Sequence, residues 1–410
     1  MGSYLNPGNE KFKEALNSPI YVDKTGLIQY TNSAVQTLQK YICVSRPRRF
    51  GKSMAANMLT AYYSRECDSH EIFDKLKIAE ADSYEKKMNQ YDTIFVNMQE
   101  FLSQSSSMDE MLDFLRKSIL WDLLETYPDF SYFNRDNLAR TMQDIYQKTH
   151  IPFIIIIDEW DCIFREYKED YEAQAKYLDF LRDFLKDKVY IHLAYMTGIL
   201  PIKKYGTHSA LNMFDEFSMT NPGPLAEYVG FTEAEVRKLC ETYGRNLEEM
   251  KEWYDGYHFI NAESVYSPRS VVTAVLTGVC DSYWNKTETF EALRIYIDMN
   301  FEGLKDDVLS MLAGERVPVN TGSFSNDMTT FHTEDDVLTL LIHLGYLGYD
   351  FYNKDVFIPN NEIRGEYVNA IAASEWGEVS LALKNSADTL RAIWQKNPDL
   401  AVKGIEQAHF

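Results

Sequence analysis

The sequence contains no apolar run of eighteen or more residues, and residues 1–5 show no signal-peptide pattern. We therefore expect no membrane span, no secretory route and a cytoplasmic location. Cysteine is also scarce. The five cysteines lie far apart, at positions 43, 67, 162, 240 and 280, without the paired spacing of a metal site. This pattern favours reduced thiols with a structural role.

The chain has fewer basic than acidic residues. It contains 41 Lys and Arg and 62 Asp and Glu, which gives a net charge of −21. Such a surface repels nucleic acid unless a local basic patch overrides it. A nucleic-acid partner therefore stays open but is not favoured. A nucleotide, a protein partner or self-association remain as the other partner classes.

One local basic group does stand out, in residues 44–53, which read VSRPRRFGKS. A phosphate-binding loop needs a glycine that lets backbone N–H groups approach the phosphates, a lysine for the β/γ oxygens, and a hydroxyl for Mg²⁺. Gly51, Lys52 and Ser53 supply these parts in order. The earlier glycine of the full pattern is missing, because Arg46 occupies its position. A basic surface turn before an ordinary helix is the alternative interpretation.

The context of this loop favours the nucleotide. An apolar run at 41–44 predicts a strand, and residues 52–64 show helical spacing without Gly or Pro. A helix that begins near Lys52 directs its positive end at the phosphates. Arg48 and Arg49 either contact the triphosphate or pair with acids such as Asp23. The expected nucleotide-binding residues are Arg48, Arg49, Phe50, Gly51, Lys52, Ser53 and Met54.

A second segment, residues 153–159 with the sequence FIIIIDE, predicts a buried strand that ends in two carboxylates. An unbroken isoleucine run is expected for a strand covered on both faces of a parallel sheet. We expect this strand to lie beside the phosphate-loop strand, so that Asp158 holds Mg²⁺ together with Ser53. Glu159 is then placed to orient the attacking water as a base. A charged strand end that merely begins a loop is the alternative.

A third apolar run, at 190–198, ends at Thr197 and Gly198. Thr197 either senses the γ-phosphate or caps the following turn. The expected catalytic residues are thus Lys52, Glu159 and Thr197.

These segments resemble the predicted AAA-ATPase-like family of bacteria, whose members are often fused to a PD-(D/E)XK nuclease-like domain. The resemblance rests on blocks at 21–25 (YVDKT), 46–53 (RPRRFGKS), 156–161 (IIDEWD), 197–200 (TGIL), 253–259 (WYDGYHF), 265–268 (VYSP) and 358–364 (IPNNEIR). It implies an ATP-binding domain, and in this family an arginine at position 46 is the usual substitute for glycine. No Glu-x-Lys element on a strand pattern follows Arg364, so we expect the nuclease-like domain to be absent or truncated.

The alternation of strands and helices predicts an α/β fold, a P-loop NTPase parallel sheet flanked by helices, followed by a mostly helical lid and a winged-helix-like domain. Further strands are expected at 93–98 and 217–219, further helices at 108–125 and 137–148, and a capping box at Thr232 and Glu235. The expected parts are an entry segment at 1–40, the P-loop ATPase core at 41–220, the helical lid at 225–330, the winged-helix-like region at 331–365 and C-terminal helices at 366–410.

The resulting hypothesis is an ATP-binding P-loop protein that works as a slow Mg-dependent ATPase. Slow turnover is expected because no arginine can be assigned from sequence to the transferring phosphoryl group. Two alternatives remain, a nucleotide-gated protein-interaction module with little turnover, and a nucleic-acid-processing ATPase that acts with a nuclease domain.

Overall fold

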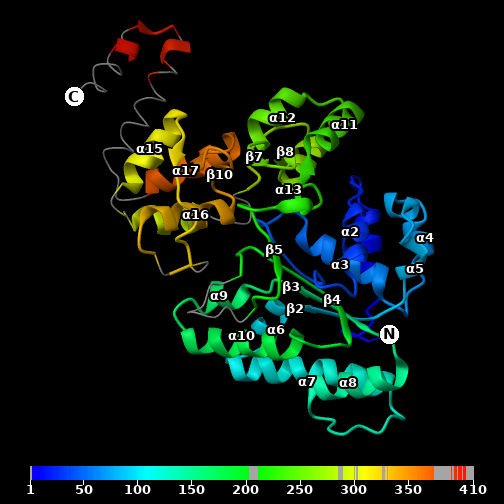
Figure 1. Cartoon of the computed structure of the whole chain (residues 1–410). Coiled ribbons are helices and arrows are strands. Elements are labelled where there is room, and N and C mark those ends of the chain that lie inside the picture. The colour runs from blue at the N-terminus through cyan, green and yellow to red at the C-terminus, as the bar shows by residue number, and fades with distance from the viewer. Residues whose placement is uncertain are drawn as a thin grey trace.

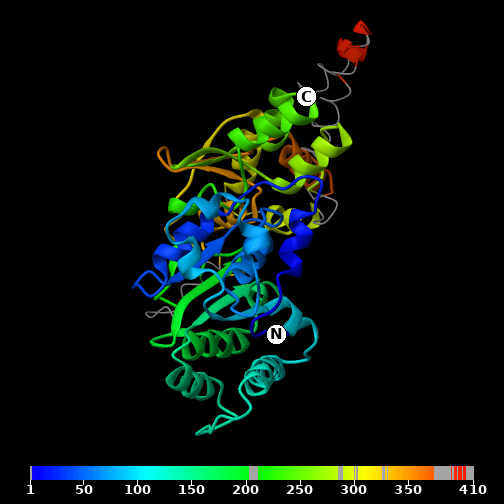
Figure 2. The ribbon, with the colours of Figure 1, turned by 90° about the vertical axis from the view of Figure 1, so that its right-hand side faces the viewer.

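The computed structural model describes residues 2–202, 211–284, 290–299, 301, 303–325, 328–329, 331–373 and a few positions between 389 and 402. Most of the C-terminal helices expected at 366–410 lie outside the described residues; 366–373 belong to a described helix, and 392–394 and 400–402 are also helical. In both ribbon views the sheet and its helices form one half of the molecule, and the later elements form the other half (Figure 1, Figure 2).

The central sheet has five strands in the order β2-β3-β4-β1-β5, and every neighbouring pair is parallel. Its strands are β1 (Tyr41–Ser45), β2 (Asp92–Asn97), β3 (Phe153–Asp158), β4 (Ile191–Gly198) and β5 (Asp215–Phe217). Strands β1 and β3 are buried along their whole length, as expected for strands covered on both faces. The expected parallel sheet is thus confirmed.

The structure corrects two details of this sheet. Strand β4 lies between β1 and β3, so the Asp158 strand is not the direct neighbour of the phosphate-loop strand. Strand order depends on long-range packing, and the sequence does not encode it locally. The fifth strand was expected at 217–219 but occupies 215–217, because its pairing with β1 runs from Asp215 to Phe217.

Helices cover both faces of the sheet, with α7, α8 and α10 on one side and α2 and α3 on the other (Figure 1). The α-helices of this half are α1 (Glu10–Leu16), α2 (Gly26–Ala34), α3 (Lys52–Tyr63), α4 (His70–Phe73), α5 (Tyr84–Lys87), α6 (Met98–Ser103), α7 (Met108–Thr126), α8 (Leu138–Thr149), α9 (Cys162–Glu166) and α10 (Tyr171–Leu185). A 3₁₀ helix, η1, spans Lys77–Glu80. Helix α3 contacts β4, β3 and β2, so it packs across these three strands.

The second half is mostly helical and holds two three-stranded antiparallel sheets, in the orders β6-β8-β7 and β10-β11-β9. Its strands are β6 (Phe231–Thr232), β7 (Tyr257–Phe259), β8 (Ala262–Tyr266), β9 (Val317–Pro318), β10 (Gly348–Asp350) and β11 (Asp355–Phe357). Its helices are η2 (Gly223–Leu225), α11 (Glu233–Tyr243), α12 (Leu247–Tyr254), α13 (Pro268–Thr277), α14 (Phe290–Asp298), α15 (Leu304–Ala313), α16 (Glu334–Leu344) and α17 (Asn361–Ala373).

Local signals account for several of these elements. The capping box expected at Thr232 and Glu235 is present at the start of α11. The hairpin of β10 and β11 forms around residues 353–354, and its assignment to a winged helix stays a prediction, as do the boundaries of the lid.

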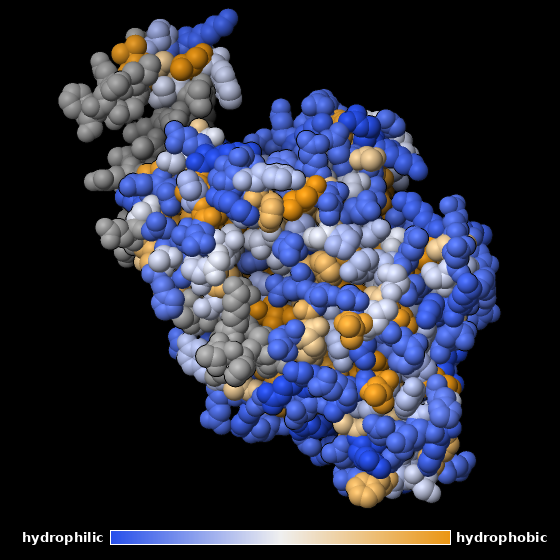
Figure 3. Space-filling view, viewed as in Figure 1, coloured by the Kyte–Doolittle hydropathy of each residue, from blue (hydrophilic) through white to orange (hydrophobic). Residues whose placement is uncertain are grey.

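The surface of the face seen in Figure 3 is largely hydrophilic, with small separate apolar patches. Among the residues that the structure describes, no helix combines the length and the apolar character needed to cross a bilayer.

Candidate functional site

The phosphate loop leaves β1 at Ser45 and enters α3 at Lys52. Gly51 has a φ of +94°, a backbone conformation that favours glycine, and an added Cβ would meet no atom within 4 Å. The space in front of the loop is therefore open. It belongs to a cavity of about 1040 Å³ whose wall includes Lys52, Ser53, Glu159 and Arg165 together with residues of the second half of the chain.

Lys52 is only 5% exposed, and its side chain turns back onto the loop. Its Nζ donates a hydrogen bond to the carbonyl oxygen of Pro47 at 2.9 Å. Burial lowers the pKa of Lys52, and three nearby carboxylates, of which Glu159 is the strongest, oppose this shift. A buried ammonium group at the floor of an open cavity is suited to an anionic ligand.

Asp158 closes β3 and is 1% exposed. Burial raises the pKa of Asp158, although the nearby Ser53 hydroxyl works in the opposite direction. The end of β3 therefore lies close to the start of α3, although β4 separates β3 from β1. One carboxylate and one hydroxyl oxygen are donors that Mg²⁺ accepts, so these two residues fit the ion that the sequence predicts.

Glu159 follows Asp158 with a φ of +53°, which is uncommon for a residue with a side chain. Its backbone N–H donates to Oδ1 of Asp158 at 3.1 Å. Its carboxylate accepts a hydrogen bond from Nη2 of Arg165. A non-glycine residue held in this region marks a place where surrounding contacts fix the backbone, and such places cluster at functional sites.

Thr197 lies beside Asp158, because the two residues are direct partners in the pairing of β3 with β4. The side chain is fully buried and is not part of the cavity wall. Its hydroxyl has no hydrogen-bond partner among the residues that the structure describes. Thr197 is thus near the expected metal ligand, while its role as a phosphate sensor stays a prediction.

Arg49 and Phe50 contact the second half of the chain. Arg49 donates from Nη1 to the carbonyl oxygen of Tyr283 at 2.7 Å, and the Phe50 ring packs edge-on against Tyr257 with centroids 5.3 Å apart. Phe50 is 1% exposed. Arg48 and Met54 are exposed and line the cavity.

Arg46, at the position of the missing glycine, is fully buried. Its Nη1 donates to the carbonyl oxygens of Ser45 and Phe217 at 2.8 and 3.0 Å, and its guanidinium lies 5.1 Å from the Phe259 ring centroid. Burial lowers the pKa of Arg46 to about 10. This arginine therefore joins the loop to β5 and β7.

Comparisons with known proteins point to one family. Residues 8–207 match the model of the family described as predicted AAA-ATPase. This segment is therefore similar to the predicted AAA-ATPase family. The chain is also 23% identical over 283 residues to an uncharacterized protein in the vnfD 5' region of Azotobacter chroococcum mcd 1, a match over 66% of this chain and 51% of the relative. The chain thus spans about half the length of that curated relative.

Two solved structures are similar at low identity. The Walker-type ATPase PABY2304 of Pyrococcus abyssi is 12% identical, with a TM-score of 0.42 over 84% of this chain and 94% of that one. The ORC2 protein of Aeropyrum pernix is 12% identical, with a TM-score of 0.35 over 90% of this chain and 99% of that one. Similarity at this level supports no argument about function.

Residues 8–207 also contain a site residue that the sequence did not reveal, Arg165 of α9. It was not singled out because no motif marks it. Its spacing from Asp161 was the signal that the sequence offered. Arg165 follows Asp161 by four residues, and side chains with this spacing are neighbours on a helix. Asp161 itself accepts hydrogen bonds from the backbone N–H groups of Ile199 and Leu200, at 3.0 and 2.8 Å.

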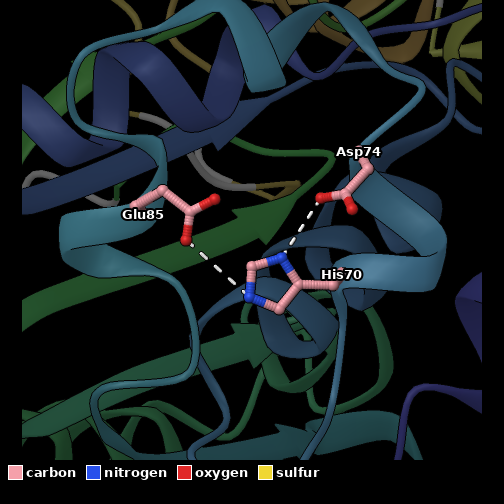
Figure 4. A group of neighbouring side chains, drawn as sticks. All are labelled: His70, Asp74 and Glu85. Carbon is pink, nitrogen blue, oxygen red and sulfur yellow. Dashed lines mark hydrogen bonds and ion pairs between the residues drawn. The ribbon is translucent and has the colours of Figure 1, made fainter.

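A second charged group lies on the surface and comprises His70, Asp74 and Glu85 (Figure 4). The imidazole lies between the carboxylates, with Nδ1 3.2 Å from Asp74 and Nε2 3.7 Å from Glu85. The two ring nitrogens therefore face different carboxylates. This arrangement suits a protonated imidazole with two partners better than a metal ion.

Proposed function

We propose that this chain binds ATP at the phosphate loop and hydrolyses it slowly to ADP and phosphate. The observation that carries the proposal is that Lys52, Ser53 and Glu159 line the wall of one open cavity, with Asp158 close to Ser53. Lys52 replaces its bond to Pro47 with bonds to the β/γ-phosphate oxygens. Backbone N–H groups from Gly51 onward, at the positive end of α3, bind the phosphates.

Ser53 and Asp158 are the residues that would hold Mg²⁺, which neutralises negative charge on the phosphates when bound. Glu159 accepts a proton from the attacking water once its carboxylate is free of Arg165. Thr197 keeps its predicted role beside Asp158.

Thermal unfolding with and without Mg·ATP tests binding. A ligand at about 100 times its Kd stabilises the folded state by about 2.7 kcal/mol, so the midpoint of the native protein should rise. The rise should vanish in Lys52→Ala and persist in the control Lys117→Ala, an exposed lysine on α7. If the native protein shows no rise at millimolar-range nucleotide, the proposed site does not bind ATP.

Phosphate release tests hydrolysis. Glu159→Gln should lower kcat by roughly 10²–10⁴-fold, the usual contribution of a general base, while the ATP-induced rise in midpoint remains. Unchanged turnover in this variant would remove Glu159 from the role of base.

A second candidate function, a nucleotide-gated interaction module, is favoured by the contacts of the loop. Arg46, Arg49 and Phe50 each contact a residue of the second half of the chain, so a ligand that shifts the loop also shifts these contacts. Hydrogen exchange of residues 254–284 should slow on ATP addition in the native protein and not in Lys52→Ala. Exchange that is identical with and without ATP would contradict this coupling.

A further inference from the structure

Arg165 is a cation on the cavity wall whose hydrogen bonds are incomplete. Its side chain is 9% exposed, and Nη2 donates to Oε2 of Glu159. Its Nε lies 3.5 Å from Oδ2 of Asp161, and this Nε makes no hydrogen bond with the part of the chain that the structure describes. A buried guanidinium donor without an acceptor costs free energy, so the present partners do not fully satisfy Arg165.

Arg165 shares the cavity wall with Lys52 and Ser53. Its positive charge is close enough to Lys52 to be one of the causes that hold the pKa of that lysine down, after burial itself. Glu159 is the anion close to both cations in this structure, because it pairs with Arg165 and raises the pKa of Lys52. A triphosphate bound by Lys52 would bring further anionic oxygens to the same wall.

Asp161 gives Arg165 a fixed support. It is fully buried, and its Oδ2 accepts the two backbone N–H groups that follow β4. Glu159 is different, because its side chain is 23% exposed to the cavity and has greater freedom to move. Of the two carboxylates beside Arg165, Glu159 is therefore the one that can be exchanged for another oxygen.

We propose that Arg165 contacts the γ-phosphate in cis, and that it gives up Glu159 for this phosphate when a triphosphate binds. The inference rests on the proposed ATPase function and deepens it, because it assigns the positive group that the sequence could not supply. The exchange also frees the Glu159 carboxylate for the attacking water.

Hydrolysis then transfers the γ-phosphoryl group of ATP to water. The water oxygen forms a bond to the γ-phosphorus, and the bond from that phosphorus to the β,γ-bridging oxygen breaks with its electron pair left on ADP. The water proton passes to Glu159. Arg165 stabilises the charge on the equatorial oxygens of the transferring group, a contribution of about 10³-fold or more in other phosphoryl-transfer enzymes.

Binding of ATP and ADP to Arg165→Gln tests this assignment without depending on turnover. A charge-assisted hydrogen bond is worth about 1.5–3 kcal/mol, so the Kd for ATP should rise by about tenfold or more. The Kd for ADP should stay the same, because ADP lacks the phosphate that Arg165 contacts. The kcat should fall by about 10³-fold.

Three further variants sharpen the test. Arg165→Lys keeps a positive charge beside Asp161, so it should fold even if Arg165→Gln does not. It loses the planar pair of donors of the guanidinium group, so it should lower kcat by about tenfold or more. Glu159→Gln frees Arg165 and should tighten ATP but not ADP, and this gain should disappear in the double variant with Arg165→Gln. Arg182→Gln, which removes a half-exposed arginine–carboxylate pair on α10, is the control and should change neither Kd.

The outcomes separate the two proposals. If the native protein binds no ATP, the proposed function and this inference both fail. If it binds ATP through Lys52 but Arg165→Gln keeps the native ratio of ATP to ADP affinity, only the inference fails. A rise in kcat in Arg165→Gln or Arg165→Lys would also overturn it, because Arg165 would then act as a lock on Glu159.

Discussion

Arg165 and His70 each lie between two carboxylates, but their surroundings differ. Arg165 is 9% exposed and faces Glu159 and Asp161, whereas His70 is half exposed and faces Asp74 and Glu85. Water screens the exposed group, so its charges contribute little to stability. In the enclosed group, removing Asp161 leaves Arg165 with a single carboxylate partner in a poorly solvated place. Burial, more than the number of partners, therefore determines what such a group can do.

The largest expected difference between the two groups concerns stability. Asp161→Ala leaves Arg165 with one carboxylate and removes the acceptor of two backbone N–H groups, so it should lower the free energy of unfolding by about 3–5 kcal/mol. Glu85→Ala removes a carboxylate that is 69% exposed and should cost less than about 1 kcal/mol. Urea denaturation of both variants measures the difference. Equal losses would contradict the role that we give to burial.

A milder variant keeps the comparison measurable if Asp161→Ala does not fold. Asp161→Asn retains an oxygen for the N–H groups of Ile199 and Leu200 and removes only the charge. Its loss should lie between those of the two alanine variants. A loss as small as that of Glu85→Ala would show that the pairing with Arg165 contributes nothing.

Glu362 of α17 shows what happens to a buried carboxylate that is held without a cation. It is 1% exposed and accepts hydrogen bonds from the Ser270 hydroxyl and from the backbone N–H groups of Tyr283 and Trp284. No cation is among the partners that the structure describes for it. Burial raises the pKa of Glu362 to about 7, against the effect of these hydrogen bonds.

The folded state therefore binds one more proton at Glu362 than the unfolded state does between about pH 4.5 and pH 7. Stability linked to this proton is present below the unfolded pKa and is lost as the pH rises through the folded pKa. The loss amounts to at most about 3.5 kcal/mol, because the pKa rises from 4.5 to about 7 and a tenfold change in proton affinity corresponds to about 1.4 kcal/mol. Unfolding measured across this range should show the decline, and Glu362→Gln should flatten it. A Glu362→Gln protein with the same pH dependence as the native one would exclude Glu362 as the source.

The elements that local pattern determines were predictable from the sequence. The Ile run of β3, the helix after Gly51 and the capping box of α11 all depend on residues that are close together in the chain. The position of β4 between β1 and β3 was not predictable, because it depends on how distant segments pair. The predicted partnership of Ser53 and Asp158 is consistent with this different strand order, because α3 crosses β4.

The candidate site also combines residues that a local sequence pattern predicts with residues that only long-range packing brings together. Lys52, Ser53, Asp158 and Glu159 belong to motifs, and motif positions can be read directly. Arg165 belongs to none, and its proximity to Glu159 comes from the turn that α9 makes after the strand. The contacts of Arg46 with Phe217 and Phe259 join residues more than a hundred positions apart, which no local pattern reveals.

The smallest expected effect concerns the exposed group. A hydrogen bond to Asp74 and, to a smaller extent, the charge of Glu85 raise the pKa of His70. Because the folded pKa is raised, the linked stability is present below the unfolded pKa of His70 and is lost as the pH rises through the folded value. NMR titration of the imidazole should show the raised pKa at low ionic strength.

The effect of salt on the pKa of a histidine distinguishes a shift caused by exposed charges from a shift caused by burial. At roughly 1 M salt the Debye length is about 3 Å, so the pKa of His70 should move back toward the ordinary value of histidine. His192 on β4 is the internal control, because burial lowers its pKa to about 4 and burial does not respond to salt in this way. If the pKa of His70 stayed raised at high salt, the group of His70, Asp74 and Glu85 would be shielded from solvent. The exposed group and the buried group around Arg165 would then not differ in screening by water.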